Sequence, residues 1–224
     1  MGLTQIVKPQ ELPVSVPQAR KQVEVPAQTT HHDIHLERLI TAATNQVQQR
    51  TGRALITQKW RLTLDRFPYG DRDRDSNNES RHGYYGRYGG YCDQRLMLPR
   101  PPLVSVDSIT YVDSFGENQT LDPECYKVGT NSSPGIIQPA YGTTWPDTQY
   151  EIEAVTIDYT AGFGDDRESI PDEYRQAILI AVDHWFDPDQ PMSGAESQGL
   201  PGAAMSLIES LHTGVKYGHY GVTE

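Results

Sequence analysis

The sequence predicts an α+β protein in which a helical body carries an inserted antiparallel β module. Apolar residues recur at helical spacing near both ends of the 224-residue chain. Between these ends, short segments alternate apolar and polar residues as half-buried strands do, and many of the 19 Gly and 16 Pro separate them. We therefore expect residues 1–53 and 169–224 to form a discontinuous helical body, and residues 54–168 to form the β module.

The first predicted helix is short and follows Ser15. Ser15 and Gln18 have the spacing of a capping box, and Pro17 suits the first turn of a helix that ends near Pro26.

A long amphipathic helix is predicted to follow and to end at Gly52. Thr30 and Asp33 have the form of a second capping box, and Gly52 suits a left-handed C-cap. The apolar stripe of this helix consists of Leu36, Leu39, Ile40, Ala43 and Val47.

Directly after Gly52 the pattern changes to the period of a strand. One face of this strand carries Ile56, Trp60, Leu62 and Leu64, and the other carries Thr57, Lys59, Arg61 and Thr63. The junction predicts a helix that leads almost directly into a sheet.

Residues 69–95 break this pattern with alternating Asp and Arg, followed by Gly and Tyr. A solvated loop between two strands is the favoured interpretation. Alternatively, its Arg and Tyr side chains could stack on nucleic-acid bases or on a partner protein. Contact with a neighbouring subunit is favoured over free DNA binding, because the Asp and Arg charges nearly cancel. The residues expected to make that contact are Tyr84, Tyr85, Arg87, Tyr88 and Tyr91.

The β module continues as roughly six or seven short strands, which predict a small sandwich or barrel. A slip in the alternation between Val106 and Ile109 indicates a bulge, and residues 113–117 have the composition of a hairpin turn. Val155, Ile157 and Tyr159 alternate cleanly in the last strand.

A third capping box, Ser169 with Asp172, predicts the helix that follows the β module. It carries two apolar stripes, so we expect both of its sides to be covered, by the long helix and by a further element. One stripe consists of Tyr174, Ala177, Ile178, Ala181 and Trp185, and the other of Leu179, Val182 and Phe186. A last short helix carries Met205, Leu207, Ile208 and Leu211, and the tail beyond it includes Tyr217 and Tyr220.

Composition limits the function. The net charge of −11 argues against a free-standing nucleic-acid binder, and no apolar run is long enough to span a bilayer. No signal peptide is recognisable, so we expect a soluble cytoplasmic chain.

Catalytic motifs are not recognisable, and we expect no cofactor and no enzyme activity. His31 and His35 could hold a metal, but a polar helix start is favoured. Asp158, Asp165 and Asp166 could act as acid and base in a hydrolase, but turn chemistry is favoured. Trp145 could form a sugar platform, although a structural corner is favoured. The residues alone predict a non-enzymatic interaction protein.

The order of several segments resembles the head-tail connector proteins of tailed bacteriophages, also called adaptor or head-completion proteins. The segments that carry the resemblance are PVSVPQARKQVEV, HLERLITAATNQVQQRTGRALITQKWRLTLDRFP, LPRPPLVSVDSITYVDSFGENQTLDP, YKV, PAYGTTWP, VTIDYTAGFGDD and IPDEYRQAILIAVDHWF. They span most of the chain from Pro13 to Phe186, while residues 69–95 and the chain beyond Pro188 depart from the pattern.

The resemblance implies a structural subunit of a neck ring of about twelve copies, placed at the head-tail junction of the virion after assembly in the host cytoplasm. Its partners would be the portal protein and a tail-side neck or terminator protein, and packaged DNA would pass through without sequence-specific binding. The helix with two apolar stripes would pack both on its own subunit and on its ring neighbour, and the expected subunit-interface residues are Tyr174, Ile178, Leu179, Val182, Trp185 and Phe186. The expected portal-binding residues are Met205, Leu207, Ile208, Leu211, Tyr217 and Tyr220. The alternative is a tail component that binds a receptor or glycan through Trp145 and the Tyr cluster.

Overall fold

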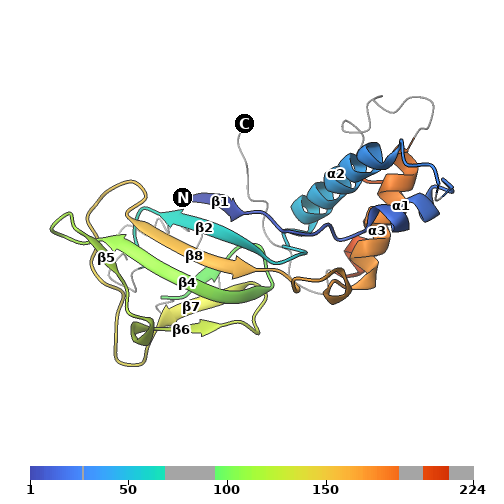
Figure 1. Cartoon of the computed structure of the whole chain (residues 1–224). Coiled ribbons are helices and arrows are strands. Elements are labelled where there is room, and N and C mark those ends of the chain that lie inside the picture. Colours follow the sequence, from blue (N-terminus) through green and yellow to red (C-terminus); the bar gives the residue numbers. More distant parts are fainter. Residues whose placement is uncertain (27, 69–93, 187–198, 212–224) are drawn as a thin grey trace. The chain divides into compact units, whose positions relative to one another are not determined.

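The computed structural model describes residues 1–26, 28–68, 94–186 and 199–211, which form two compact units (Figure 1). The β unit comprises residues 1–8 and 57–162, and the helical unit comprises residues 9–56 and 163–224. The predicted α+β class is confirmed, because four helices and two antiparallel sheets are present in the described part of the chain.

The larger sheet of the β unit has five antiparallel strands. In spatial order they are β1 (Gly2–Val7), β2 (Gln58–Leu64), β8 (Val155–Ala161), β4 (Leu103–Val112) and β5 (Asn118–Thr120). The alternation predicted for β2 is confirmed, since Leu62 and Leu64 are buried whereas Lys59 and Arg61 are exposed. The predicted bulge is also present, as a register shift between Val106 and Ser108.

Strand β1 differs from the expectation that residues 1–53 belong to the helical body. It pairs with β2 from Gly2 opposite Thr63 to Val7 opposite Lys59, with a register shift between Gln5 and Val7. Such a short strand at a sheet edge does not need a strict alternation of apolar residues, so its sequence lacks a clear strand pattern.

The smaller sheet has three antiparallel strands and lies in the same unit (Figure 1). They are β3 (Leu96–Leu98), β7 (Gly135–Pro139) and β6 (Tyr126–Gly129), and the short helix η2 (Pro123–Cys125) precedes β6. Gly135 packs closely on Leu103 of β4, where an added Cβ would lie 2.5 Å from that side chain. The Tyr159 hydroxyl of β8 also donates a 2.8 Å hydrogen bond to the Pro99 carbonyl, which follows β3.

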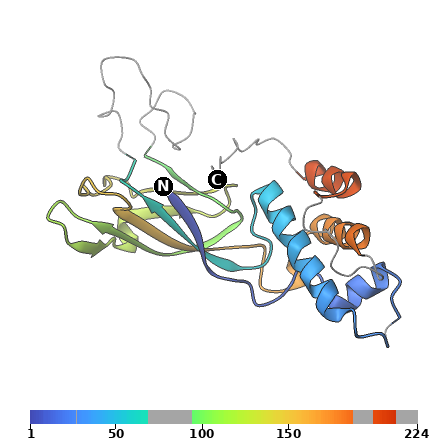
Figure 2. The same ribbon diagram turned by 90° about the horizontal axis from the view of Figure 1, so that it is seen from above.

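The helical unit contains α1 (Val16–Gln22), α2 (Asp33–Thr51), α3 (Asp172–Trp185), α4 (Gly202–Ser210) and the short helix η3 (Arg167–Ser169). Figure 2 shows α2, α3 and α4 from a second direction. The unit has its own core, in which Leu36, Ile40 and Val47 of α2 and Ala177 and Ile178 of α3 are fully buried.

Two of the predicted caps are confirmed. Ser15 and Gln18 form both hydrogen bonds of a capping box on α1. Gly52 ends α2 with φ = 64°, a left-handed conformation that costs Gly little.

The other two predicted capping boxes are wrong. The N-cap of α2 is His32, and the Asp33 carboxylate accepts a 2.6 Å hydrogen bond from Arg20 Nε of α1. The N-cap of α3 is Pro171, and Ser169 lies in η3. In both cases the chain makes a turn before the helix, so the hydroxyl of the expected cap residue is not at the helix start.

Candidate functional site

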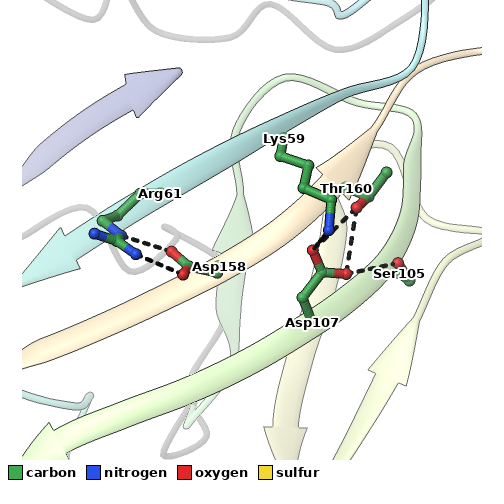
Figure 3. Close-up of polar contacts among 6 residues, drawn as sticks. All are labelled: Lys59, Arg61, Ser105, Asp107, Asp158 and Thr160. Atoms are coloured by element: carbon green, nitrogen blue, oxygen red, sulfur yellow. Dashed lines mark hydrogen bonds and ion pairs between the residues drawn. The ribbon is translucent and has the colours of Figure 1, made fainter. Parts of the chain in front are cut away.

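Polar side chains from three neighbouring strands gather on one face of the larger sheet (Figure 3). We call this group the polar face. It consists of Lys59 and Arg61 of β2, Asp158 and Thr160 of β8, and Ser105 and Asp107 of β4.

Arg61 and Asp158 form its most regular contact. They are direct cross-strand partners, and Arg61 Nε and Nη2 each donate a 2.7 Å hydrogen bond to one carboxylate oxygen. The hydrogen bonds and the negative charge of Asp158 raise the pKa of Arg61. A planar guanidinium joined to both carboxylate oxygens is the strongest geometry for such a pair.

Asp107 is brought to the same face by irregular strand pairing. Register shifts occur on both sides of Val106. Ser105 and Asp107 are exposed to solvent, whereas Leu103 and Ile109 are buried. Lys59 Nζ lies 2.8 Å from one Asp107 oxygen, and the hydrogen bond and charge of Asp107 raise the pKa of Lys59. Ser105 and Thr160 donate longer hydrogen bonds to Asp107, of 3.2 and 3.2–3.3 Å.

The polar face therefore holds its charges in neutralising pairs. Each carboxylate already has a cationic partner, so Asp158 has the role of one member of an ion pair and not that of a free acid or base. The hypothesis of a hydrolase also named Asp165 and Asp166. Those two residues belong to the helical unit and are exposed to solvent. A rigid surface of paired charges suits contact with another polar surface better than proton transfer.

The histidines at the start of α2 form an aromatic cluster with Phe186. The His31 and His32 rings lie 3.9 Å apart, and the rings of His32 and His35 lie 5.5 and 5.9 Å from Phe186. Burial, and then the charges of His32 and Arg38, lower the pKa of His35. Within the described residues, no group of three His, Cys, Asp or Glu side chains could hold a metal ion.

Trp145 does not form a sugar platform, because its side chain is only 5% exposed. Its ring stacks on Phe67 at 4.8 Å with an interplanar angle of 2°, and its indole N–H donates a 2.8 Å hydrogen bond to the Gln94 carbonyl. Trp145 therefore stabilises the β unit by packing and hydrogen bonding, as the interpretation of a structural corner predicts.

Most of the predicted interface residues of α3 lie inside the helical unit. Tyr174, Ile178, Val182 and Trp185 are buried in its core, so their side chains are not offered to a neighbouring subunit. Leu179 and Phe186 are half-buried. The second apolar stripe faces the unit's own helices because α4 packs on α3, a tertiary contact that periodicity cannot reveal.

Leu179 instead lines a groove that sequence reasoning did not identify. The groove has a volume of about 530 Å³, and residues of α1, α3 and α4 line it. Its lining residues are Val14, Gln18, Asp172, Glu173, Arg175, Gln176, Leu179 and Leu207. The same groove is thus lined by Leu179, an expected interface residue, and by Leu207, an expected portal-binding residue.

The remaining predicted site residues divide into two groups. In α4 and its C-cap, Ile208 is buried, whereas Met205, Leu207 and Leu211 are half-buried. Tyr217 and Tyr220, and the loop residues Tyr84, Tyr85, Arg87, Tyr88 and Tyr91, lie outside the described residues. In the part of the chain that the structure describes, no helix is both long enough and apolar enough to cross a membrane.

Comparison with known proteins gives matches in structure only. No protein-family model matches the chain. No curated protein sequence matches it either.

The chains with a similar fold include members of three solved structures. One is described as the virion of a native gene transfer agent (GTA) particle, with 22% identity and a TM-score of 0.69. A second is described as the neck of an empty GTA particle computed with C6 symmetry, with 22% identity and a TM-score of 0.71. A third is described as the neck of a native GTA particle computed with C12 symmetry, with 21% identity and a TM-score of 0.62. Each match covers 98% of this chain and 99% of the other. The chain therefore shares its fold, over nearly its whole length, with chains of GTA particles.

Proposed function

We propose that this protein is a structural subunit of the neck of a tailed, phage-like particle, where it forms a ring between the portal and the tail and extends the DNA channel. The observation that carries the proposal is the likeness in fold to chains of GTA necks over 98% of the sequence. The resemblance of the sequence segments to head-tail connector proteins points to the same position in a particle.

The symmetry of the similar structures supports a ring of twelve copies. Their descriptions name C12 symmetry for one neck and C6 for another, and a twelve-membered ring satisfies both. A closed ring needs two different surfaces on each subunit that contact each other between neighbours. The polar face supplies charges in fixed positions, and Leu179 and Phe186 supply half-buried apolar side chains for such contacts.

The portal contact is proposed for the end of the helical unit that carries α4. Met205, Leu207 and Leu211 are half-buried there, so part of each apolar side chain is available to a partner. Tyr217 and Tyr220 follow on the tail of the same helix. Loss of these side chains should reduce portal binding and leave the fold of the β unit unchanged.

The net charge of −11 supports passage of DNA without binding. A channel wall of the same sign as the phosphate backbone repels DNA and does not retain it. The role is structural, and the paired carboxylates of the polar face agree with a protein that has no catalytic function.

The decisive experiment is electron microscopy of the particle with and without this chain. Particles that contain it should show a ring of its density between portal and tail. Particles from which it has been deleted should lack that ring and carry no tail. Tailed particles of normal appearance after the deletion would contradict the proposal.

A matched experiment on the purified proteins tests the portal contact. The chain and the portal protein are mixed, and their association is measured by mass photometry. The variant Met205→Ser/Leu207→Ser/Leu211→Ser should bind the portal more weakly, whereas Tyr141→Ser, which changes an exposed side chain of the β unit, should bind as the wild type does. Equal binding of both variants would contradict this assignment of the portal contact.

A further inference from the structure

Three large apolar side chains are almost fully exposed at one end of the β unit. Phe115 is 92% exposed, Tyr150 is 98% exposed and Ile152 is 83% exposed. We call these three residues the end patch. Single exposed apolar side chains are common on proteins, but several large ones on one surface are typical of an interaction site.

The end patch comes from two segments that lie side by side. Phe115 lies between β4 and β5, and Tyr150 and Ile152 precede β8. Asp113 and Thr148 form a β-bridge between the segments, and the Gln149 N–H donates a 3.1 Å hydrogen bond to the Val112 carbonyl. The two segments that carry the three exposed side chains are therefore neighbours in the β unit.

The hairpin tip that holds Phe115 is fixed by hydrogen bonds. The Asp113 carboxylate accepts hydrogen bonds from the N–H groups of Phe115, at 2.9 Å, and Glu117, at 3.0 Å. These bonds favour the ionised carboxylate and lower the pKa of Asp113.

The segment with Tyr150 and Ile152 is anchored at both of its ends. On one side Trp145 is stacked on Phe67, and on the other the Glu153 N–H donates a 3.1 Å hydrogen bond to the Asp65 carboxylate. The end patch is thus already formed, which reduces the conformational entropy that binding would cost.

Charge indicates the kind of partner. Residues 113–117 and 147–153 contain five acidic residues and no Lys or Arg. Asp113 is half-buried and accepts hydrogen bonds from neighbouring groups, whereas the other four acidic residues are exposed. An apolar patch with acidic neighbours complements an apolar surface surrounded by Lys and Arg.

A second copy of the chain fits this description poorly. The groove of the helical unit has apolar walls, including Leu179 and Leu207. Its lining also carries Asp172 and Glu173, and the lining residue Arg175 is already paired with Asp172. The carboxylate of Glu173 would face those of Glu117 and Glu151, and like charges oppose association.

We propose that the end patch docks on a different protein, whose surface offers apolar pockets surrounded by Lys and Arg. Phe115, Tyr150 and Ile152 enter the pockets, and Glu117 and Glu151 contact the surrounding cations. This proposal rests on the β unit alone and does not depend on the position of the chain in a particle.

Photo-cross-linking in the cells that naturally produce the chain tests the proposal. The photoreactive residue p-benzoylphenylalanine replaces Phe115 or Tyr150. The matched control replaces Tyr141, which is fully exposed and follows β7 of the smaller sheet. Cross-linked peptides are identified by mass spectrometry, and sedimentation of the wild-type chain with particles is measured in parallel.

The expected result is that positions 115 and 150 both cross-link to one protein that is not this chain. The cross-linked sites on that protein should lie next to Lys or Arg residues. The double substitution Glu117→Lys/Glu151→Lys should reduce the cross-link yield at least about fivefold, because it reverses the charges beside the patch. The proposal is overturned if the cross-links join two copies of this chain, if they do not exceed the Tyr141 control, or if charge reversal has no effect. Failure of the wild-type chain to sediment with particles, with the cross-links intact, would contradict the neck function and leave the docking proposal supported.

Discussion

Arg61 and Asp158 lie directly opposite each other on antiparallel strands, and two hydrogen bonds of 2.7 Å join the guanidinium group to both carboxylate oxygens. Their side chains are 47% and 20% exposed, so water screens the pair substantially. The geometry is close to ideal, but partial exposure limits its contribution to stability. The value of the pair is that it fixes two charges at known positions on the polar face.

A double-mutant cycle on this pair should give a small coupling energy. Arg61→Ala, Asp158→Ala and the double variant are compared by chemical denaturation, and we expect a coupling of about 0.2–1 kcal/mol. Asp158→Asn is the control that removes charge but keeps the size of the side chain. A coupling above about 2 kcal/mol would show that the pair behaves as a buried one.

Replacement of Trp145 by Ala should destabilise the β unit by about 3–5 kcal/mol, because the substitution leaves a cavity against Phe67 and removes the hydrogen bond to Gln94. The free energy of unfolding is measured by denaturant titration. Tyr150→Ala, which truncates an exposed aromatic residue in the same connection, should change it by less than about 0.5 kcal/mol. Equal effects of the two substitutions would contradict the anchoring role of Trp145.

Gly52→Val should destabilise α2, because φ = 64° brings a branched side chain into conflict with its own backbone. No atom lies within 4 Å of an added Cβ, so the cost of about 1–2 kcal/mol is conformational and not steric against neighbours. Thermal unfolding followed by circular dichroism measures it. Gly52→Asn should lose clearly less stability, since Asn tolerates this conformation. If Val and Asn are equally destabilising, packing and not backbone conformation determines the stability effect of substitutions at position 52.

Mild acid should weaken the helical unit through His35. The lowered pKa means that the folded state holds His35 neutral, while the unfolded chain takes up a proton near the ordinary value of 6.5. Stability is therefore present above that value and falls as the pH drops toward the folded-state pKa.

The variant His35→Gln should lose less stability than the wild type when the pH is lowered from about 7 to about 5, a range centred near the ordinary histidine pKa. Unfolding curves at several pH values give the comparison, and His31→Gln serves as a control that keeps His35. An unchanged pH dependence in His35→Gln would show that another group titrates.

The sequence by itself determined the type of most elements, because local patterns reflect local physics. Ser15 with Gln18 and the glycine at position 52 were enough to locate the start of α1 and the end of α2, since each acts within one turn of its helix. The alternation in β2 and the slip after Val106 likewise follow from the two-residue period of a strand.

Only the tertiary structure decided which apolar residues are internal and which charges meet. Tyr174, Ile178, Val182 and Trp185 looked available for a neighbouring subunit, but the contacts that bury them come from segments far away in the chain. Arg61 and Asp158 are 97 residues apart, and their pairing depends on strand register. The segments that carry Phe115 and Tyr150 are likewise distant in the sequence, and the bridge between Asp113 and Thr148 joins them. Periodicity shows that a helix or strand has an apolar face, but only the packing of distant segments determines what covers that face.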